Sequence, residues 1–130
     1  MAGAELNTIH EYELPVAGLR LRLRCLALGR DFCLVLGGGQ EHIGAVALAQ
    51  PRPSLEKPER VSATASVLAL PGHQEDLLAR ELALKAASAL DAPVCVLCGI
   101  HLDRAAPDTI NSLVQAAHQL VEDFLASRAF

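Results

Sequence analysis

The amino-acid sequence predicts an α+β domain of about six strands and two helices, and three hydrophobic patterns support this fold class. Apolar and polar residues alternate through much of the first half, as they do in strands with one buried face. Two later segments repeat apolar residues every three or four positions, which is typical of amphipathic helices. A short run between these two segments is apolar throughout, which indicates a central strand covered on both faces. Without an internal repeat or a domain boundary, residues 1–130 are expected to form one domain.

Four strands are expected in the first fifty residues. In the clearest, Leu19 to Leu26, leucine alternates with arginine, so Arg20, Arg22 and Arg24 share one face, which is most simply solvated or a polar edge. The other three are expected over residues 6–14, 32–36 and 43–49. Between the last two, the glycines Gly37–Gly39 are expected to form either a plain hairpin loop or a loop whose backbone N–H groups bind a phosphate.

The second half of the chain is expected to contain two strands and two helices. Three prolines between Gln50 and Pro58 indicate an irregular surface loop, because proline removes a backbone donor. The elements that follow are a strand over 61–70, a helix over 74–90, a strand over 93–100 and a C-terminal helix. The last helix is expected to start near Pro107, since proline suits the first helical position.

The composition argues against several classes of function. The chain is 52% hydrophobic and can bury a core, but only 3% of its residues are aromatic, so Ala, Leu and Val must fill that core. A net charge of −4 without a basic cluster argues against a nucleic-acid partner. No run reaches the roughly 20 apolar residues that cross a bilayer, and the N-terminus lacks a basic start and an apolar run. We therefore expect a cytoplasmic protein with reduced cysteines and no membrane partner.

Cys95 and Cys98 form the CxxC pattern of some metal and redox sites, but they lie within an expected strand. Side chains three positions apart on a strand point to opposite faces, so the two thiols would diverge. Redox CxxC pairs lie instead at the start of a helix, which lowers the thiol pKa. Both cysteines are therefore interpreted as buried core residues.

Three histidines, His42, His73 and His101, lie beside glycines at the expected ends of elements. Glycine lets the backbone turn sharply and approach a ligand, so three such segments indicate one shared pocket. Glu41 precedes His42, and Asp103 lies two residues after His101, so carboxylates are at hand to orient the rings. The candidate metal ligands are therefore His42, His73, His101 and Asp103, and zinc would suit them. The alternative is that Gly-His ends these elements by chance.

Two arginines in expected loops are candidates for binding an anionic ligand. Arg52 and Arg104 are both expected beside the pocket, and a guanidinium group can hold a phosphate through two hydrogen bonds. The alternative interpretation is that each is an ordinary exposed arginine.

The order and spacing of several short motifs resemble a known family. The motifs are Gly38-Gly39-x-x-His42-Ile43-Gly44-Ala45-Val46-Ala47, Pro51-Arg52-Pro53-Ser54, Leu70-Pro71-Gly72-His73 with Asp76, and Gly99-Ile100-His101-Leu102-Asp103. From about Leu19 to Leu125, the chain is similar to the prenylated-flavin chaperones encoded beside some UbiD-type decarboxylases, including gallate decarboxylase. That family in turn resembles the proteasome assembly chaperones.

The resemblance implies a small antiparallel β-sandwich of about six strands flanked by two helices, and usually a homodimer. It also implies a non-catalytic function: holding reduced prenylated FMN after an FMN prenyltransferase makes it, and delivering it to the apo UbiD-type decarboxylase. The matching positions, which would bind the flavin or a metal ion, are Gly38, Gly39, His42, Arg52, His73, His101 and Asp103. With one Tyr, three Phe and no Trp in the chain, an apolar slot of Leu, Val and Ile would have to hold the flavin ring.

Two other functions are compatible with the residues. In the first, the chain is a protein-assembly scaffold of the proteasome-assembly-chaperone type, and its histidines are structural. In the second, the chain is a small metal-dependent hydrolase, in which the histidines hold zinc and Glu41 or Asp103 is the general base. The sequence contains no HExxH or similar spacing to support the hydrolase.

Overall fold

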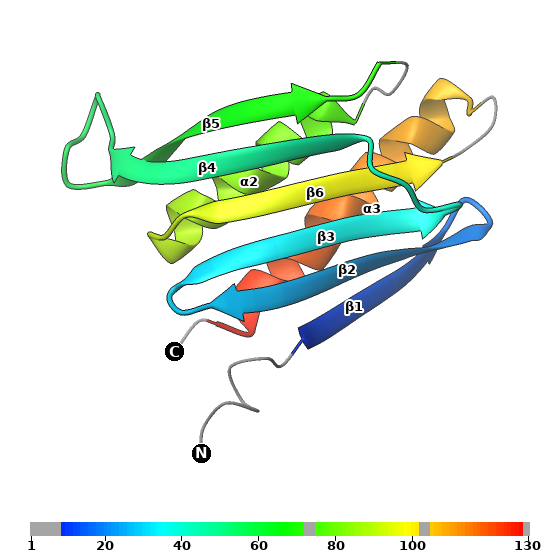
Figure 1. Cartoon of the computed structure of the whole chain (residues 1–130), viewed down its shortest axis with the longest axis horizontal. Coiled ribbons are helices and arrows are strands. Elements are labelled where there is room, and N and C mark those ends of the chain that lie inside the picture. Colours follow the sequence, from blue (N-terminus) through cyan, green and yellow to red (C-terminus); the bar gives the residue numbers. More distant parts are fainter. Residues whose placement is uncertain (1–8, 72–74, 102–104, 129–130) are drawn as a thin grey trace.

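Six strands and two helices follow one another in the predicted order in the computed structural model, which describes residues 9–71, 75–101 and 105–128 (Figure 1). The strands are β1 (Ile9–Val16), β2 (Leu19–Leu28), β3 (Asp31–Gly39), β4 (Ala45–Pro53), β5 (Val61–Ala69) and β6 (Val94–His101). The helices are α2 (Asp76–Leu90), between β5 and β6, and α3 (Pro107–Ala126), after β6. The predicted α+β class is therefore confirmed. Neither of these described helices is long and apolar enough to span a bilayer.

All six described strands belong to one sheet, in the order β1-β2-β3-β6-β4-β5. Neighbouring strands are antiparallel except β3 and β6, which are parallel. The strands thus form a single mixed sheet, and not the two antiparallel sheets of the expected sandwich. The parallel pair arises because α2 carries the chain from the β5 edge back to the middle of the sheet, where β6 lies between β3 and β4.

Both helices pack on the same face of the sheet, α2 against β4, β5 and β6, and α3 against β1 and β2 (Figure 1). Small alanines on β4 and α2 let that helix lie close to the strands. These alanines are Ala45, Ala47 and Ala49 on β4, and Ala79, Ala83, Ala86 and Ala87 on α2. Under α3, the fully buried ring of Phe124 packs edge to face against Tyr12 and Phe32, with centroids 6.2 and 5.4 Å away. A chain with few aromatic residues thus concentrates three of them in one cluster.

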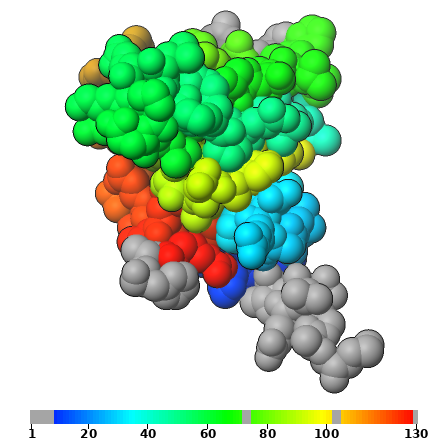
Figure 2. All heavy atoms as spheres, turned by 90° about the vertical axis from the view of Figure 1, so that its left-hand side faces the viewer, coloured from blue at the N-terminus to red at the C-terminus, as the bar shows by residue number. Residues whose placement is uncertain are grey.

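The opposite face of the sheet carries no helix among the described residues. In Figure 2, α3 (orange to red) lies along one side of the sheet, while the side turned away from it consists of strands. On this uncovered face, Val35, Leu97 and Val46 are register neighbours and are only half-buried, whereas Val96, which points to the helices, is fully buried. The expectation that the strand over 93–100 is covered on both faces is therefore wrong within one chain.

Strand β4 is longer than the sequence predicts, because it continues through Pro51 to Pro53. The three prolines of this region indicated an irregular loop. In the structure, Pro51 and Pro53 pair with β5, whereas the pairing of β4 with β6 already ends at Ala49. On the β6 side of these prolines there is thus no carbonyl group that would need a backbone N–H from β4. The N–H groups that proline lacks are not required there, so the strand tolerates both residues.

Candidate functional site

The ends of β3 and β6 and the start of β4 meet at one end of the sheet (Figure 1). Because β6 lies between β3 and β4, the connecting residues 40–44 have to cross the end of β6. Glycines make room for this crossing. A side chain at Gly99 would overlap the carbonyl oxygen of His42, and one at Gly37 would overlap the carboxylate of Glu41. The hairpin-loop interpretation of the glycine run is therefore wrong, since Gly37–Gly39 forms the end of a strand whose neighbour is β6.

His42 and His101 come together at this crossing, with their rings edge to face and their centroids 5.9 Å apart. Both nitrogens of His42 face acceptors: Nδ1 is 3.2 Å from the carbonyl oxygen of Gln40, and Nε2 is 3.3 Å from Oε1 of Glu75. The Glu75 side chain is only 13% exposed, and Gly44 leaves space for its other carboxylate oxygen. The ring of His42 thus lies between two oxygen atoms, and the cluster is suited to contact a polar group of a ligand.

Glu75 is the member of this cluster that sequence reasoning missed. It is the N-cap residue of α2, although its side chain makes no capping hydrogen bond. Acidic residues are common at the electropositive start of a helix, so Glu75 carries no distinguishing signal in the sequence. Only the folded chain shows that it faces His42.

The predicted metal site depends on four residues, of which the structure describes two. His42 and His101 are close together, whereas His73 and Asp103 lie outside the described residues, as does Arg104. Within residues 9–71, 75–101 and 105–128, no group of three or more His, Cys, Asp or Glu side chains is placed to hold a metal ion. The described chain thus brings two imidazoles to the predicted site, and the other ligands stay predictions.

Arg52 lies at the far end of β4 from this cluster. Its Nε donates to Oγ1 of Thr64 at 2.7 Å, and its Nη1 donates to the carbonyl oxygen of Pro53 at 3.0 Å. Arg52 is seven positions beyond Ala45, where the strand starts, which corresponds to about 24 Å along the strand. The expectation of a loop position beside the pocket is therefore corrected: Arg52 belongs to a strand, on the side of the molecule remote from His42.

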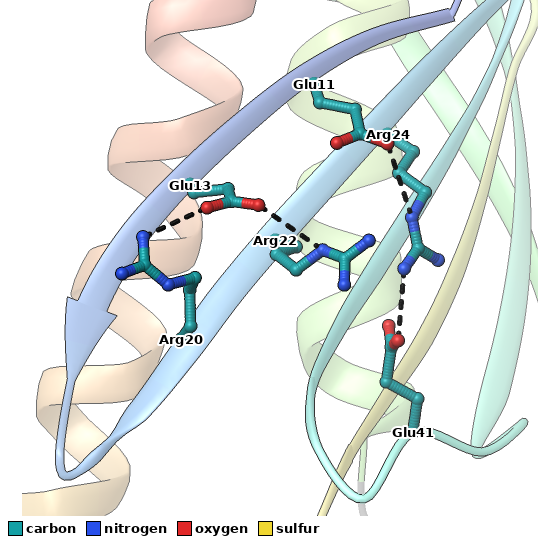
Figure 3. A network of polar contacts seen from close by, with 6 residues as sticks. All are labelled: Glu11, Glu13, Arg20, Arg22, Arg24 and Glu41. Atoms are coloured by element: carbon teal, nitrogen blue, oxygen red, sulfur yellow. Dashed lines mark hydrogen bonds and ion pairs between the residues drawn. The ribbon is translucent and has the colours of Figure 1, made fainter.

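The arginines of β2 lie on the uncovered face, as their alternation with leucine predicts, and they form a network with glutamates (Figure 3). Glu13 of β1 lies between two of them: it accepts a hydrogen bond from Nη1 of Arg20 at 3.0 Å, and its other oxygen is 3.5 Å from Nε of Arg22. The second distance is longer than an ordinary charge-assisted hydrogen bond.

A groove with a cavity volume of about 330 Å³ opens beside this network. Its lining consists of Gly18, Leu19, Arg20, Arg22, Gly38, Gly39 and Glu41. The groove therefore combines two guanidinium groups, one carboxylate and the backbone of three glycines. It adjoins the histidine cluster, because Gly39 is the register partner of His101.

A second hollow, with a volume of about 250 Å³, lies between the two helices and β6. Its lining is Leu78, Ile100, Ala105, Ile110, Leu113, Val114 and Glu75. Apart from Glu75, every lining residue is apolar. Glu75 connects this apolar hollow to His42, and Ile100 is the register partner of Gly38 in the groove. Both hollows therefore lie at the same end of the sheet.

Cys95 and Cys98 diverge as predicted, but only one of them is a core residue. Cys98 points to the helices and is fully buried, and this burial raises its pKa to about 12. Cys95 points to the uncovered face and is half-buried. The interpretation of both thiols as buried is therefore wrong for Cys95, because neither of the two described helices covers its side of β6.

Comparison with known proteins identifies the family of the chain. The family model described as a prenylated flavin chaperone LpdD-like domain matches residues 16–129. The comparison with curated proteins gives no match. Among solved structures, the chain is similar to one described as the crystal structure of a novel chaperone complex for yeast 20S proteasome assembly. The TM-score is 0.49 at 14% identity, over 90% of this chain and 98% of that one, and this likeness carries no argument about function.

Proposed function

Since the chain belongs to the family of LpdD-like prenylated flavin chaperones, we propose that it binds reduced prenylated FMN and delivers it to an apo UbiD-type decarboxylase. The observation that carries this proposal is the extent of the family match, residues 16–129, which includes both hollows and the histidine cluster. The proposed function is non-catalytic, and the FMN prenyltransferase is the source of the ligand.

The geometry of the site supports this proposal. A prenylated flavin has a largely planar fused-ring end and a charged phosphate end. The apolar hollow under Ile100 suits the first end, and the polar groove beside Gly39 suits the second. The two hollows lie on opposite faces of the sheet but at the same end of it, and His42 and His101 lie at that end, so their rings are positioned to contact polar atoms of the flavin. The proposed site consists of Gly38, Gly39, His42, Glu75 and His101, together with His73, and it does not include Arg52.

A divalent metal ion is a second component of the proposal. His42 and His101 would supply two imidazole ligands, and His73 and Asp103 would complete the set. Two neutral imidazoles with a nearby carboxylate are the donors that zinc and similar ions prefer. Elemental analysis of the purified protein, with and without ligand, tests this component. If His101→Ala leaves the metal content unchanged, the ion does not bind at this cluster.

A homodimer in the cytoplasm is the proposed form of the protein. The uncovered face of the sheet supports it, because Val35, Leu97 and Val46 form an apolar centre there that a second copy could cover. Partly exposed apolar residues that lie together on a surface are typical of an interface.

The decisive experiment is anaerobic native mass spectrometry of the protein purified from cells that co-express an FMN prenyltransferase. We expect a mass increment equal to prenylated FMN, which is absent when the prenyltransferase is absent. After mixing with the apo-decarboxylase, the increment should move to the decarboxylase. The matched variants are His101→Ala, which should lower occupancy, and His10→Ala on exposed β1, which should not. A protein that carries no flavin under these conditions would refute the proposed function and favour the assembly scaffold.

A further inference from the structure

The groove on the uncovered face owes its shape to glycine. Gly18, at the β1–β2 turn, has φ +77°, and an added Cβ there would meet nothing within 4 Å. At Gly39, with φ +63°, an added Cβ would lie 2.6 Å from the carbonyl oxygen of His101. Side chains at these positions would strain the backbone or narrow the groove. The floor of the groove is therefore bare backbone, and its functional groups come from Arg20, Arg22 and Glu41.

Charge is unevenly distributed along the network that borders the groove (Figure 3). On one side, two arginines, Arg20 and Arg22, share the single carboxylate of Glu13, so this half has a net charge of +2 − 1 = +1. The excess positive charge lies on the two side chains that line the groove. This half of the network can therefore accept one more anionic group.

The other half of the network has the opposite balance. Nε of Arg24 lies 3.9 Å from Oε1 of Glu11, and its Nη2 lies 3.0 Å from Oε1 of Glu41. One arginine is therefore paired with two carboxylates, and the net charge of this half is +1 − 2 = −1. Only Glu41 of this half lines the groove. The groove thus offers an anion-binding side and, next to it, a carboxylate that can accept hydrogen bonds from hydroxyl groups.

Arg22 is the arginine with unused donor capacity at this position. Its Nε is buried without a hydrogen-bond partner among the described residues, and its distance to Oε1 of Glu13 is 3.5 Å. A buried guanidinium N–H without an acceptor is costly, and a phosphate oxygen is the acceptor that arginine binds best. Arg22 therefore has donor capacity that Glu13 does not use, and an anion in the groove would supply a further acceptor for its guanidinium group.

We infer that the groove binds the ribityl phosphate arm of the flavin, with the phosphate on Arg20 and Arg22 and the ribityl hydroxyls on Glu41. This inference rests on the proposed function. It assigns a ligand to Arg20 and Arg22, which the sequence indicated only as part of a charged sheet face, and to Glu41, which the sequence indicated as a carboxylate that orients a histidine or as the general base of a hydrolase. The position agrees with it, because Gly39 of the groove pairs with His101 and Gly38 pairs with Ile100 of the apolar hollow. One ligand can therefore have its phosphate arm in the groove and its ring near the strand ends.

The test compares two ligands in anaerobic titrations: reduced prenylated FMN, and the same compound after a phosphatase has removed its phosphate. The wild-type protein should bind the phosphorylated ligand at least about tenfold more tightly, as expected for charge-assisted hydrogen bonds. Arg22→Gln should bind both ligands about equally. Arg22→Lys, which keeps the charge, should retain part of the preference. The matched control is Arg60→Gln, which removes an exposed arginine remote from the groove and should bind like the wild type.

The outcomes separate this inference from the proposed function. If the wild type binds both ligands equally, or if folded Arg22→Gln keeps the full preference, the groove does not bind the phosphate, although the chain is still a flavin chaperone. If Arg22→Gln fails to fold, two further measurements replace it: the ligand preference of Arg20→Gln, and the displacement of the bound flavin from the wild type by inorganic phosphate. The inference is refuted if Arg20→Gln still prefers the phosphorylated ligand as strongly as the wild type does and inorganic phosphate does not compete. If the wild type binds neither ligand, the proposed function fails, and the inference fails with it.

Discussion

Cys33 of β3 and Cys95 of β6 face each other across the parallel strand pair, on the face of the sheet that the helices leave uncovered. The pKa of the Cys33 thiol is raised, chiefly by partial burial and then by the neighbouring Cys95 thiol, which also shares a hydrogen bond with it. Neighbouring strands are about 4.8 Å apart, which is within the Cα separation that a disulfide bridges. The two thiols are therefore close enough to form a disulfide, in contrast to those of the Cys95–Cys98 motif, which point to opposite faces of the strand.

The first prediction is that Cys33 and Cys95 form an intramolecular disulfide under mild oxidation. With diamide as the oxidant, the two thiols lose two protons and two electrons, and the azo group of diamide is reduced to the hydrazine. Intact-mass measurement should show the loss of two hydrogens, and peptide mapping should join the two cysteines. Cys33→Ser should prevent this mass change, whereas Cys98→Ala should not. A bridge between Cys95 and Cys98 would contradict the strand geometry.

The second prediction concerns stability at alkaline pH. Burial raises the pKa of both Cys25 and Cys98 from 9.0 to about 12. Above pH 9 the unfolded chain loses these two protons while the folded chain keeps them, so the free energy of unfolding should fall as pH rises from 9 towards 12. The upper limit is about 1.4 kcal/mol per pH unit for each thiol. Urea unfolding between pH 8 and pH 11 measures this slope, and it should become shallower in Cys98→Ala. An unchanged slope in that variant would show that the thiol does not titrate as argued.

The third prediction tests the crossing of residues 40–44 over β6. Gly99→Ala should destabilise the fold by about 3 kcal/mol or prevent folding, because the new methyl group would overlap the backbone of His42. Gly38→Ala is the graded control: its Cβ would lie 3.0 Å from the side-chain Cδ1 of Leu19, which can move. Chemical unfolding monitored by circular dichroism compares the two variants. Equal losses of stability in Gly99→Ala and Gly38→Ala would mean that the backbone of residues 40–44 can move aside as easily as the Leu19 side chain.

The order and type of the elements could be predicted from the sequence because hydrophobic periodicity reports which residues share a buried face. The strict alternation of β2 predicted its charged face, and the stripe on α3 includes the core residues Leu113, Val121 and Phe124. Sheet order could not be predicted, since the insertion of β6 between β3 and β4 depends on packing between distant segments. The uncovered face was missed for the same reason, because an apolar strand has the same pattern whether a helix or another molecule covers it.

The two histidines of the candidate site that the structure describes could be predicted from local signals, whereas Glu75 and the position of Arg52 could not. His42 and His101 could be paired because both stand beside glycines at strand ends, and the structure brings them together. The position of Arg52 was predicted wrongly, because the prolines beside it indicate a loop. They fit a strand only because the pairing of β4 with β6 ends before them, which the sequence does not reveal. Glu75 could not be predicted as a site residue, because an acidic residue at the start of a helix is already explained by the positive end of the helix dipole. Residues that act through tertiary contacts lack a sequence signature of their own.

The fourth prediction concerns Glu75, whose Oε1 lies 3.3 Å from Nε2 of His42. If this carboxylate orients the imidazole for ligand binding, Glu75→Gln should weaken binding of reduced prenylated FMN by about tenfold, since the charged partner of His42 is replaced by a neutral amide. The melting temperature should change little, because the N-cap side chain makes no capping hydrogen bond. Asp76→Asn, the adjacent acidic residue in the first turn of α2, is the matched control and should bind normally. Anaerobic titration and thermal unfolding separate the two effects. Unchanged affinity in Glu75→Gln would show that the His42–Glu75 pair serves the fold and not the ligand, and an equal loss in Asp76→Asn would assign the effect to the charge of the helix start.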